Sequence, residues 1–390
     1  MTPDRGTAAD RAWLRRAARL ALRGHGGAEP NPMVGAVLVR PVGGEDRDGR
    51  GAGCVLGEGH HARCGGAHAE RVAIADALRR GCDLRGATLY VTLAPCCGTG
   101  RTPPCTDAII EAGVARVVFA REDAHPKGRD ARRVLEAAGV RVDLLPEPAA
   151  LAVGESFAHR VERGLPWVIA KWAQSVDGRI ATSSGESRWI SGERSRAMVH
   201  RERGRVDAIL TGIGTVLADD PLLTARGVRR RRVALRVVLD RRLRLPLRSR
   251  LVASARDVPL IVFAEADRIG SESAAALRGS GVELRTIDRS PTALATVLRG
   301  LAATDGVSTL LVEAGPKLLG ALLREGLLCE AWIFTAGRMF GDDLAPGPVG
   351  GGSAAPDFAG ATGLATAPRF RLVDLRRRGG DAMSLWRRAL

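Results

Sequence analysis

The residues His68-Ala69-Glu70, followed by Pro95-Cys96 and then by Cys105, restrict the fold and chemistry of this 390-residue chain more than any other stretch. A zinc ion at a catalytic site takes three protein ligands and one water, and one imidazole with two thiolates suffices. We therefore expect His68, Cys96 and Cys105 to bind one zinc ion. Glu70 follows His68 by two residues near the start of a predicted helix, so it can reach the metal-bound water without being a ligand.

The spacing of the two cysteines departs from the signature of zinc deaminases, which is His-x-Glu followed by Pro-Cys-x-x-Cys, with the glutamate as general acid and base. Here Cys105 follows Cys96 by nine residues, so the intervening segment has to loop out and return, and Cys97 is a competing thiol. A structural zinc site or unrelated core thiols are the alternatives. We expect the other cysteines to be small buried residues, and these are Cys54, Cys64, Cys82 and Cys329.

Apolar patterns along the chain predict an α/β protein with two domains. In residues 1–146, helices and strands alternate, with helices expected at 11–23, 67–80, 106–112 and 131–138 and strands at 33–40, 88–93, 114–120 and 140–145. Pro146 and Pro148 indicate a linker over 147–165. A second α/β domain is expected over 166–390, with strands at 167–173, 208–211, 236–239, 260–263 and 309–313 and a loop at 346–363.

Composition narrows the class of protein further. Hydrophobic residues make up 45% and charged residues 26% of the chain, which are ordinary values for a globular protein and exclude disorder as its main state. No stretch approaches the roughly 18 uncharged apolar residues of a membrane helix, and arginines interrupt any signal core near the N-terminus. We expect a cytoplasmic protein with reduced cysteines and no membrane partner.

The formal net charge of +16 raises the possibility of a nucleic-acid partner. Arginine supplies all but three of the 59 basic residues and is spread along the chain, which indicates biased coding rather than a binding patch. Aromatic residues, which stack nucleobases, make up only 4%, so we expect no nucleic-acid partner. The local cluster of Arg229–Arg232, Arg241, Arg242 and Arg244 is expected to be a solvated loop, with a phosphate contact as the alternative.

The second half has no Gly-x-Gly-x-x-Gly motif, so the usual dinucleotide-binding argument does not apply. Glycines do follow two predicted strands, in Leu210-Thr211-Gly212-Ile213-Gly214 and in Glu313-Ala314-Gly315-Pro316. Glycine there allows backbone N–H groups to approach a phosphate at a helix N-terminus. Nucleotide binding and ordinary turns both remain open on this ground. Lys171 is a rare lysine that precedes Ser175-Val176-Asp177-Gly178, which indicates a need for a compact ammonium or mere chance.

The N-terminal motifs resemble the deaminase half of the bifunctional riboflavin-biosynthesis deaminase/reductase family. The resemblance rests on Pro30-Asn31-Pro32-Met33-Val34-Gly35, Gly59-His60-His61, His68-Ala69-Glu70, Tyr90-Val91-Thr92-Leu93 and Gly100-Arg101-Thr102-Pro103-Pro104-Cys105. A second cysteine nine positions after the first is this family's pattern. It implies a cytidine-deaminase-like three-layer domain in which Glu70 is catalytic. It also implies that Asn31, His61 and Arg101 bind a phosphoribosylated pyrimidine.

The second half resembles the reductase half of the same family, which is similar to dihydrofolate reductase in fold and uses NADPH. The resemblance rests on Lys171–Gly178, Gly185–Ile190, Thr215–Pro221 and Val312–Pro316. It implies NADPH contacts at Ala173, Trp189, Thr215, Asp219, Gly315, Pro316, Lys317, Leu318, Leu319, Gly320 and Ala321. It implies substrate contacts at Lys171, Ser187, Arg203, Leu223, Arg226 and Glu313, where the arginine forks suit a phosphate. The family also suggests a homo-oligomer, a dimer or tetramer.

Some positions depart from the family pattern. Ala94 stands where Glu is usual, Gly98 where His is usual, and the turn Asp123–Arg129 is one residue shorter. Further along, Cys329-Glu330 replaces Asp-Glu and Ala336-Gly337-Arg338 replaces Ala-Pro-Lys. These changes leave two alternatives to riboflavin biosynthesis, a paralogue in a secondary pathway to a pyrimidine-derived metabolite and a deaminase with a degenerate reductase half.

Overall fold

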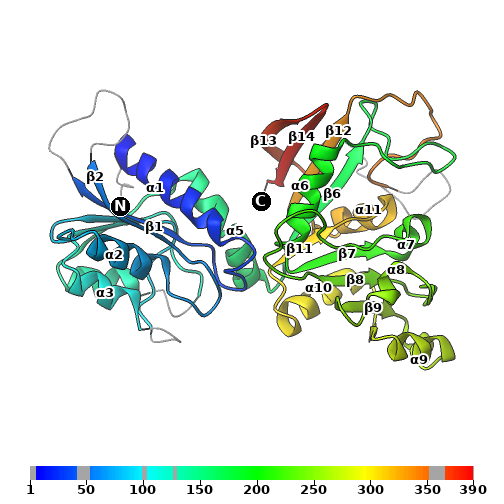
Figure 1. Ribbon diagram of the computed structural model, residues 1–390, viewed down its shortest axis with the longest axis horizontal. Coiled ribbons are helices and arrows are strands. Elements are labelled where there is room, and N and C mark those ends of the chain that lie inside the picture. The colour runs from blue at the N-terminus through cyan, green and yellow to red at the C-terminus, as the bar shows by residue number, and fades with distance from the viewer. Residues whose placement is uncertain (1–5, 42–52, 99–102, 126–129, 351–364, 390) are drawn as a thin grey trace. The chain divides into compact units, whose positions relative to one another are not determined.

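A computed structural model describes residues 6–41, 53–98, 103–125, 130–350 and 365–389 (Figure 1). The chain divides into two compact units, Met1–Gly164 and Leu165–Leu390. Both are built from α/β layers, as expected. Within the described ranges no helix is long and apolar enough to cross a membrane.

The first unit is a five-stranded sheet of order β2-β1-β3-β4-β5. β1 pairs antiparallel with β2 and β3, whereas β3, β4 and β5 are parallel. The strands are β1 (Gly35–Pro41), β2 (Gly53–His60), β3 (Thr88–Val91), β4 (Arg116–Phe119) and β5 (Arg141–Leu144). The helices are α1 (Ala8–Ala21), α2 (Ala69–Arg79), α3 (Cys105–Glu111), α4 (Ala131–Ala137) and α5 (Pro148–Arg163), with the short 3-10 helix η1 at Leu22–Gly24.

Alternate residues of each strand face opposite sides of this sheet, and each side has its own core. Val37, Val39 and Tyr90 pack with α1 and with the start of α5. Leu38, Leu89 and their neighbours pack with α2, α3 and α4. Helices therefore cover both faces (Figure 1), which confirms the expected three-layer deaminase domain.

The expectation of a linker over 147–165 is wrong. Most of that segment forms α5, which buries Ala150 and Val153 against the α1 face of the first unit. Pro148 begins this helix rather than separating domains, because the first helical position needs no N–H and suits the fixed φ of proline. Gly164 ends it in the left-handed conformation, at φ 65°.

The second unit is a nine-stranded sheet of order β10-β9-β8-β7-β11-β6-β12-β14-β13. All neighbouring strands are parallel except those that pair with β14. The strands are β6 (Trp167–Gln174), β7 (Ala208–Gly212), β8 (Leu235–Leu239), β9 (Leu260–Ala264), β10 (Glu283–Thr286), β11 (Thr309–Val312), β12 (Glu330–Ala336), β13 (Phe370–Arg378) and β14 (Asp381–Arg388).

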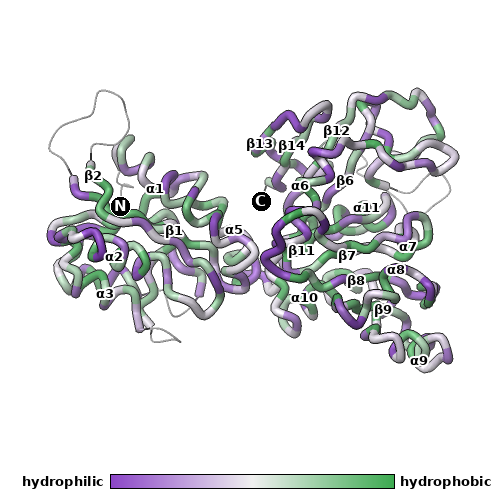
Figure 2. The backbone as a smooth tube through the Cα atoms, in the orientation of Figure 1, coloured by the Kyte–Doolittle hydropathy of each residue, from purple (hydrophilic) through white to green (hydrophobic). Residues whose placement is uncertain are grey.

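Helices again cover both faces of the second sheet, and apolar residues recur along its central strands (Figure 2). α6 (Glu193–Arg203), α7 (Ile213–Asp219), α8 (Arg250–Ala253) and α9 (Glu272–Gly279) contribute to one core. α10 (Ala293–Thr304) and α11 (Pro316–Arg324) contribute to the other, and the 3-10 helix η3 spans Ala266–Arg268. The expected loop over 346–363 lies mostly outside the described residues.

Candidate functional site

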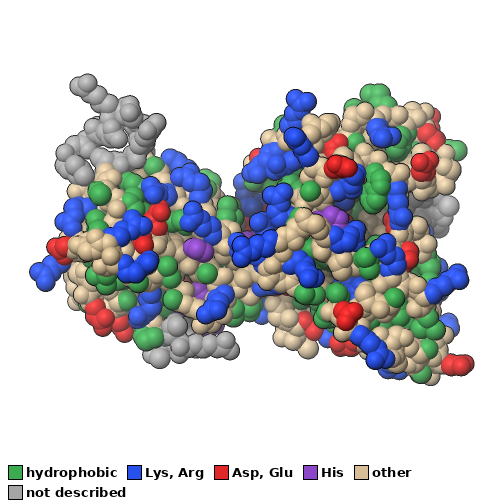
Figure 3. Space-filling model, viewed as in Figure 1, with side chains coloured by type: hydrophobic (Ala, Val, Ile, Leu, Met, Phe, Trp, Pro, Cys, Tyr) green, Lys and Arg blue, Asp and Glu red, His purple; other side chains and the backbone are tan. Residues whose placement is uncertain are grey.

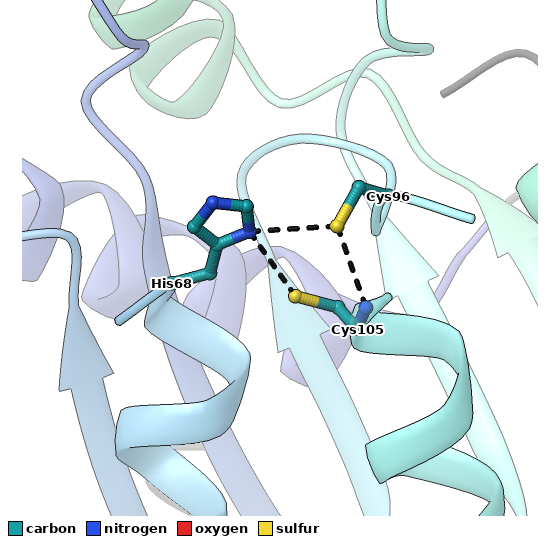
Figure 4. Close-up of side chains that lie close together, drawn as sticks. All are labelled: His68, Cys96 and Cys105. Carbon is teal, nitrogen blue, oxygen red and sulfur yellow. Dashed lines mark hydrogen bonds between the residues drawn. The ribbon is translucent and has the colours of Figure 1, made fainter. Parts of the chain in front are cut away.

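In the first unit, the structure brings His68, Cys96 and Cys105 together (Figure 4). Nδ1 of His68 lies 3.4 Å from Sγ of Cys96 and 3.3 Å from Sγ of Cys105. His68 is the residue that precedes α2, Cys105 is the first residue of α3, and Cys96 lies in the segment after β3. The chain therefore does loop out after Cys96 and return at Cys105, as the long cysteine spacing requires.

Backbone hydrogen bonds fix this return. The N–H groups of Cys105 and Thr106 both donate to the carbonyl oxygen of Cys96, at 3.0 and 3.2 Å. Nη2 of Arg71 in α2 donates to the carbonyl oxygen of Pro104 at 2.8 Å, so it connects α2 to the residue that precedes α3. Sequence reasoning missed Arg71, although it directly follows Glu70.

The three side chains fit a zinc ion. One ligand atom from each lies within 4.8 Å of the others, and one imidazole nitrogen with two sulfurs is a donor set that zinc prefers. The cluster contains Cys96 rather than the adjacent Cys97. The hydrogen bond with Cys105 lowers the pKa of Cys96 to about 4, which favours the thiolate that binds metal. The hydrogen bond with Cys96, together with burial, raises the pKa of Cys105.

Glu70 lies in the first turn of α2 with only 4% of its surface exposed. Burial raises its pKa to about 7. A carboxyl group with a pKa near neutrality can both accept and donate a proton at working pH. Its location beside the cluster agrees with the role expected from the sequence.

Two more predicted residues, Asn31 and His61, lie next to the cluster. His61 is buried, and its ring contacts the ring of His68 edge to face at 5.4 Å. Burial lowers the pKa of His61, so its neutral ring donates from Nδ1 to the carbonyl of Ala67 at 3.0 Å. Nε2 then accepts a bond from Nδ2 of Asn31 at 3.2 Å. Arg101, the third predicted substrate contact here, lies outside the described residues, as does the end of the turn 123–129.

In the second unit, Lys171, Arg203 and Glu313 form a half-buried group of charges. Arg203 donates to both carboxylate oxygens of Glu313, at 2.5 and 2.8 Å. Nζ of Lys171 lies 3.8 Å from Oε2 of Glu313. Burial alone would raise the pKa of Glu313, but Arg203 and Lys171 lower it to about 2. Burial lowers the pKa of Lys171, which Glu313 opposes. The sequence predicted all three residues but not their pairing.

The loop after α7 adds two more predicted residues, Leu223 and Arg226. Nη1 of Arg203 donates to the carbonyl of Thr224 at 3.3 Å, which ties this loop to the charged group. Leu223 is buried, and Arg226 is exposed, with a pKa lowered by partial burial and by the nearby charge of Arg203. Ser187 is half-buried and, among the described residues, makes no hydrogen bond with this group.

The residues predicted to contact NADPH gather at the carboxyl edge of the central strands. Gly212 is the last residue of β7 and precedes α7, whereas Gly315 follows β11 and precedes α11; β7 and β11 are neighbouring parallel strands. A Cβ added at Gly315 would lie 3.9 Å from Oγ1 of Thr215, so these positions are adjacent. Ala173 lies near the end of β6, on the other side of β11. Two glycine-capped helix starts at one edge fit a pyrophosphate.

Within the segment 315–321, Pro316 and Leu318 are half-buried, Lys317 is exposed and Ala321 is half-buried, whereas Leu319 and Gly320 are buried. Leu319 packs into the core beneath the helix. Within this segment, residues 316–318 at the start of α11 are therefore accessible.

Trp189 is connected to Asp219 through the preceding residue, Arg188, whose guanidinium donates to the carbonyl of Asp219 and lies 3.5 Å from its carboxylate. Trp189 is 62% exposed, and the guanidinium of Arg196 lies 4.8 Å from its ring centre. Both residues line a pocket of about 400 Å³ that also includes Asp381 from the C-terminal hairpin.

The exposure of the remaining cysteines and of the arginine cluster can be compared with the expectations from the sequence. Cys82 is half-buried and Cys329 is buried, but Cys54 and Cys64 are exposed, so the expectation of buried thiols is wrong for these two. Arg229, Arg230 and Arg231 are exposed, whereas Arg232 pairs with Asp207. On the face drawn in Figure 3, basic side chains are scattered among other types.

Comparison with known proteins agrees with this architecture. Residues 7–121 match the family described as the cytidine and deoxycytidylate deaminase zinc-binding region, and residues 166–383 match the RibD C-terminal domain. The fold and its two sites thus define a bifunctional enzyme in which a zinc-binding deaminase unit precedes an NADPH-dependent reductase unit.

Individual relatives identify the family. The chain is 36% identical over 380 residues to the riboflavin biosynthesis protein RibD of Escherichia coli, which covers 95% of this chain and 97% of the relative. It is 36% identical over 344 residues to RibD of Aquifex aeolicus, with 87% and 90% covered. A solved deaminase/reductase structure from Thermotoga maritima matches with a TM-score of 0.80 and 33% identity over 98% of this chain and 99% of that one. The chain belongs to the RibD family of riboflavin biosynthesis proteins.

Proposed function

We propose that the chain catalyses two consecutive steps of riboflavin biosynthesis on one phosphoribosylated pyrimidine. The first is the hydrolytic deamination of 2,5-diamino-6-(5-phosphoribosylamino)pyrimidin-4-one, and the second is the reduction of the ribosyl side chain to ribityl by NADPH. The Thermotoga maritima protein is named as a deaminase of this diaminopyrimidine and as the reductase of the resulting uracil. The observation that carries the proposal is that one unit contains a His/Cys/Cys cluster and the other contains a half-buried Lys/Arg/Glu group.

For the deaminase, His68, Cys96 and Cys105 would hold zinc, which when bound supplies a polarised water as nucleophile. Glu70 would accept a proton from the attacking water and deliver it to the departing ammonia, so that water adds and ammonia leaves at carbon 2 of the pyrimidine. Asn31 and His61 would orient the pyrimidine, because their side chains form a hydrogen-bonded pair beside the cluster. Arg101 would bind the phosphate.

For the reductase, the substrate would lie against the charged group and the loop after α7. Its proposed contacts are Lys171, Ser187, Arg203, Leu223, Arg226 and Glu313. The cofactor would lie along the carboxyl edge of the sheet, with its pyrophosphate at the start of α11. Its proposed contacts are Ala173, Trp189, Thr215, Asp219 and residues 315–321. NADPH supplies the hydride for C1′ of the ribose, and the protein supplies placement and electrostatics.

We assign the deaminase step to the unit that ends at Gly164 and the reductase step to the unit that follows. We also place the enzyme in the cytoplasm, because zinc-binding thiols need a reducing compartment.

A homo-oligomer, either a dimer or a tetramer, is part of the proposal. β13 is the last strand of its sheet, and Leu372, Val373 and Leu375 on it are exposed. An apolar edge strand readily pairs with another strand. Light scattering should give a mass above one chain, and Leu375→Glu should lower it, while Leu247→Glu at another exposed leucine should not. A monomeric mass for the unaltered protein refutes this assembly.

The proposed activity is tested by a one-pot assay of zinc-loaded protein with the diaminopyrimidinone substrate. Ammonia release should precede NADPH oxidation, and the two should reach equal amounts. Cys105→Ser should abolish both in this assay but retain NADPH oxidation when the deaminated intermediate is supplied. Ammonia without NADPH oxidation would support the degenerate reductase. If zinc is bound and neither product forms, the assignment fails in favour of the secondary-pathway paralogue, which the comparisons do not support.

A further inference from the structure

Arg236 on β8 is a buried cation whose role nothing above explains. Its exposed fraction is 0%, and burial lowers its pKa to about 10, with no neighbouring charge among the described residues opposing the shift. Nε has no hydrogen-bond partner among those residues. Burial of a guanidinium without a counter-charge is unfavourable, so this arginine needs a compensating role.

The guanidinium connects two segments through backbone oxygens. On one side it donates to Oγ of Ser254 at 2.7 Å and to the carbonyls of Ser254 and Val258 at 3.2 and 2.5 Å. On the other side Nη1 donates to the carbonyl of Leu222 at 3.3 Å. Arg236 therefore links the turn after α8 to the loop 220–226.

That loop has an unfavourable backbone shape. Asp220 and Leu223 both adopt positive φ, at 39° and 51°. Residues with a Cβ disfavour this left-handed region, leucine more than aspartate, so the surrounding contacts have to impose it. The same loop presents Leu223 and Arg226, which are proposed to bind the phosphoribosyl group.

Nδ1 of His200 lies 3.1 Å from the carbonyl oxygen of Thr224, and three further side-chain contacts hold the loop at different points. Oδ1 of Asp220 accepts from the backbone N of Arg250 at 2.8 Å. The carbonyl of Thr224 accepts from Arg203 at 3.3 Å. Arg236 alone among these three acts between the two left-handed residues, at Leu222.

We propose that Arg236 is a positioning residue for the reductase substrate. By holding the carbonyl of Leu222 from the core, it keeps the loop 220–226 in its left-handed shape, and so it places Leu223 and Arg226 against the phosphoribosyl group. The inference rests on the proposed function of the second unit, because it needs that loop to bind substrate.

Steady-state kinetics of Arg236→Met and Arg236→Lys test this role, with the deaminated intermediate supplied directly. In both variants KM for the intermediate should rise about tenfold or more, as expected for loss of a charge-assisted hydrogen bond. We expect kcat to stay within about twofold of the unaltered enzyme. KM for NADPH should not change, because the substitution does not alter the proposed cofactor contacts. Inhibition by ribose 5-phosphate, used as a competitor of the intermediate, should weaken by a similar factor.

Arg256→Met is the matched control. Arg256 lies in the same turn but is exposed, and it donates to the carbonyl of Gly279 at 2.8 Å rather than to the loop 220–226. The Arg256→Met substitution should leave kcat and both KM values unchanged. Arg236→Lys retains a cation at this position, so the test can still be made if Arg236→Met does not fold.

The outcomes separate this inference from the function on which it rests. If the unaltered enzyme does not reduce the intermediate, the proposed function fails before any variant is compared. If it does, and both Arg236 variants fold with an unchanged KM for the intermediate, the positioning role is refuted alone. A parallel rise in both KM values would equally refute it, because it would indicate a general loss of structure.

Discussion

Replacement of Gly59 by alanine should displace the proposed zinc site, although Gly59 touches no ligand. Gly59 lies on β2, where it faces α2. A Cβ there would lie 2.2 Å from the carbonyl oxygen of Ala69 and 2.5 Å from the backbone N of Ala73. Both are helix backbone atoms that cannot rotate aside. The helix therefore has to retreat by about 1.2 Å for the first contact to reach an ordinary 3.4 Å.

A retreat of that size exceeds what the site tolerates. Ala69 lies between His68 and Glu70, so both move with it. Zinc–ligand distances hold within about 0.2 Å, and a displacement of about 1 Å can lower a rate about 100-fold. The strain should also lower the free energy of unfolding by about 1–3 kcal/mol. We expect Gly59→Ala to lose most of its zinc and about 99% of its ammonia release.

The assay is zinc content by atomic emission together with ammonia release and NADPH oxidation on the deaminated intermediate. The reductase rate should be unchanged because the clash lies in the other unit. Gly154→Ala is the control, since a Cβ there meets nothing within 4 Å inside α5, and it should stabilise the unit by about 0.5–1 kcal/mol. A Gly59→Ala protein with full zinc and an unchanged ammonia rate would refute the reasoning.

Three further changes test other contacts. Burial alone would raise the pKa of Asp10, but hydrogen bonds from Arg116 and Tyr90 hold it below 3.8; its charge therefore stabilises the fold above about pH 4, and Asp10→Asn should lower Tm equally from pH 5 to 8, with the difference disappearing as pH falls through the folded-state pKa. Glu313→Gln leaves two half-buried cations without their carboxylate, so NADPH oxidation should be lost and the free energy of unfolding lowered by about 2 kcal/mol, while ammonia release persists. Asp381 accepts from the N–H of Gly192, the residue that caps α6; Asp381→Ala should cost about 1 kcal/mol in urea unfolding and raise KM for NADPH. An unaltered Tm in the first, retained reduction in the second or an unchanged KM in the third would contradict these contacts.

Local patterns predicted most of the central elements. The strand predicted at 167–173 is β6, and the one at 88–93 contains β3. Such strands are short apolar runs between glycines and prolines, which is the signal that sequence shows most plainly. β2 and the hairpin of β13 and β14 were not predicted, because their burial patterns lack a strict alternation and their faces depend on neighbours elsewhere in the chain.

The prediction of a linker at Pro146 and Pro148 failed for a related reason. Proline interrupts a helix in its interior but favours the first turn. Which of these applies at Pro148 depends on whether the residues that follow can be buried. Ala150 and Val153 are buried by α1 and the first sheet, and a local reading cannot supply that partner.

By itself the sequence predicted the three residues of the proposed zinc site, the glutamate beside them and the order of the two units. Few residue types bind zinc, so His68, Cys96 and Cys105 can be recognised as candidate ligands in the sequence despite their unusual spacing. Only the tertiary structure decided how charges pair and which loops are held. Arg203 meets Glu313 across 110 residues of chain, and Arg236 reaches Leu222 from the core. Such partners depend on how strands and helices pack, and no local pattern of residues encodes that packing.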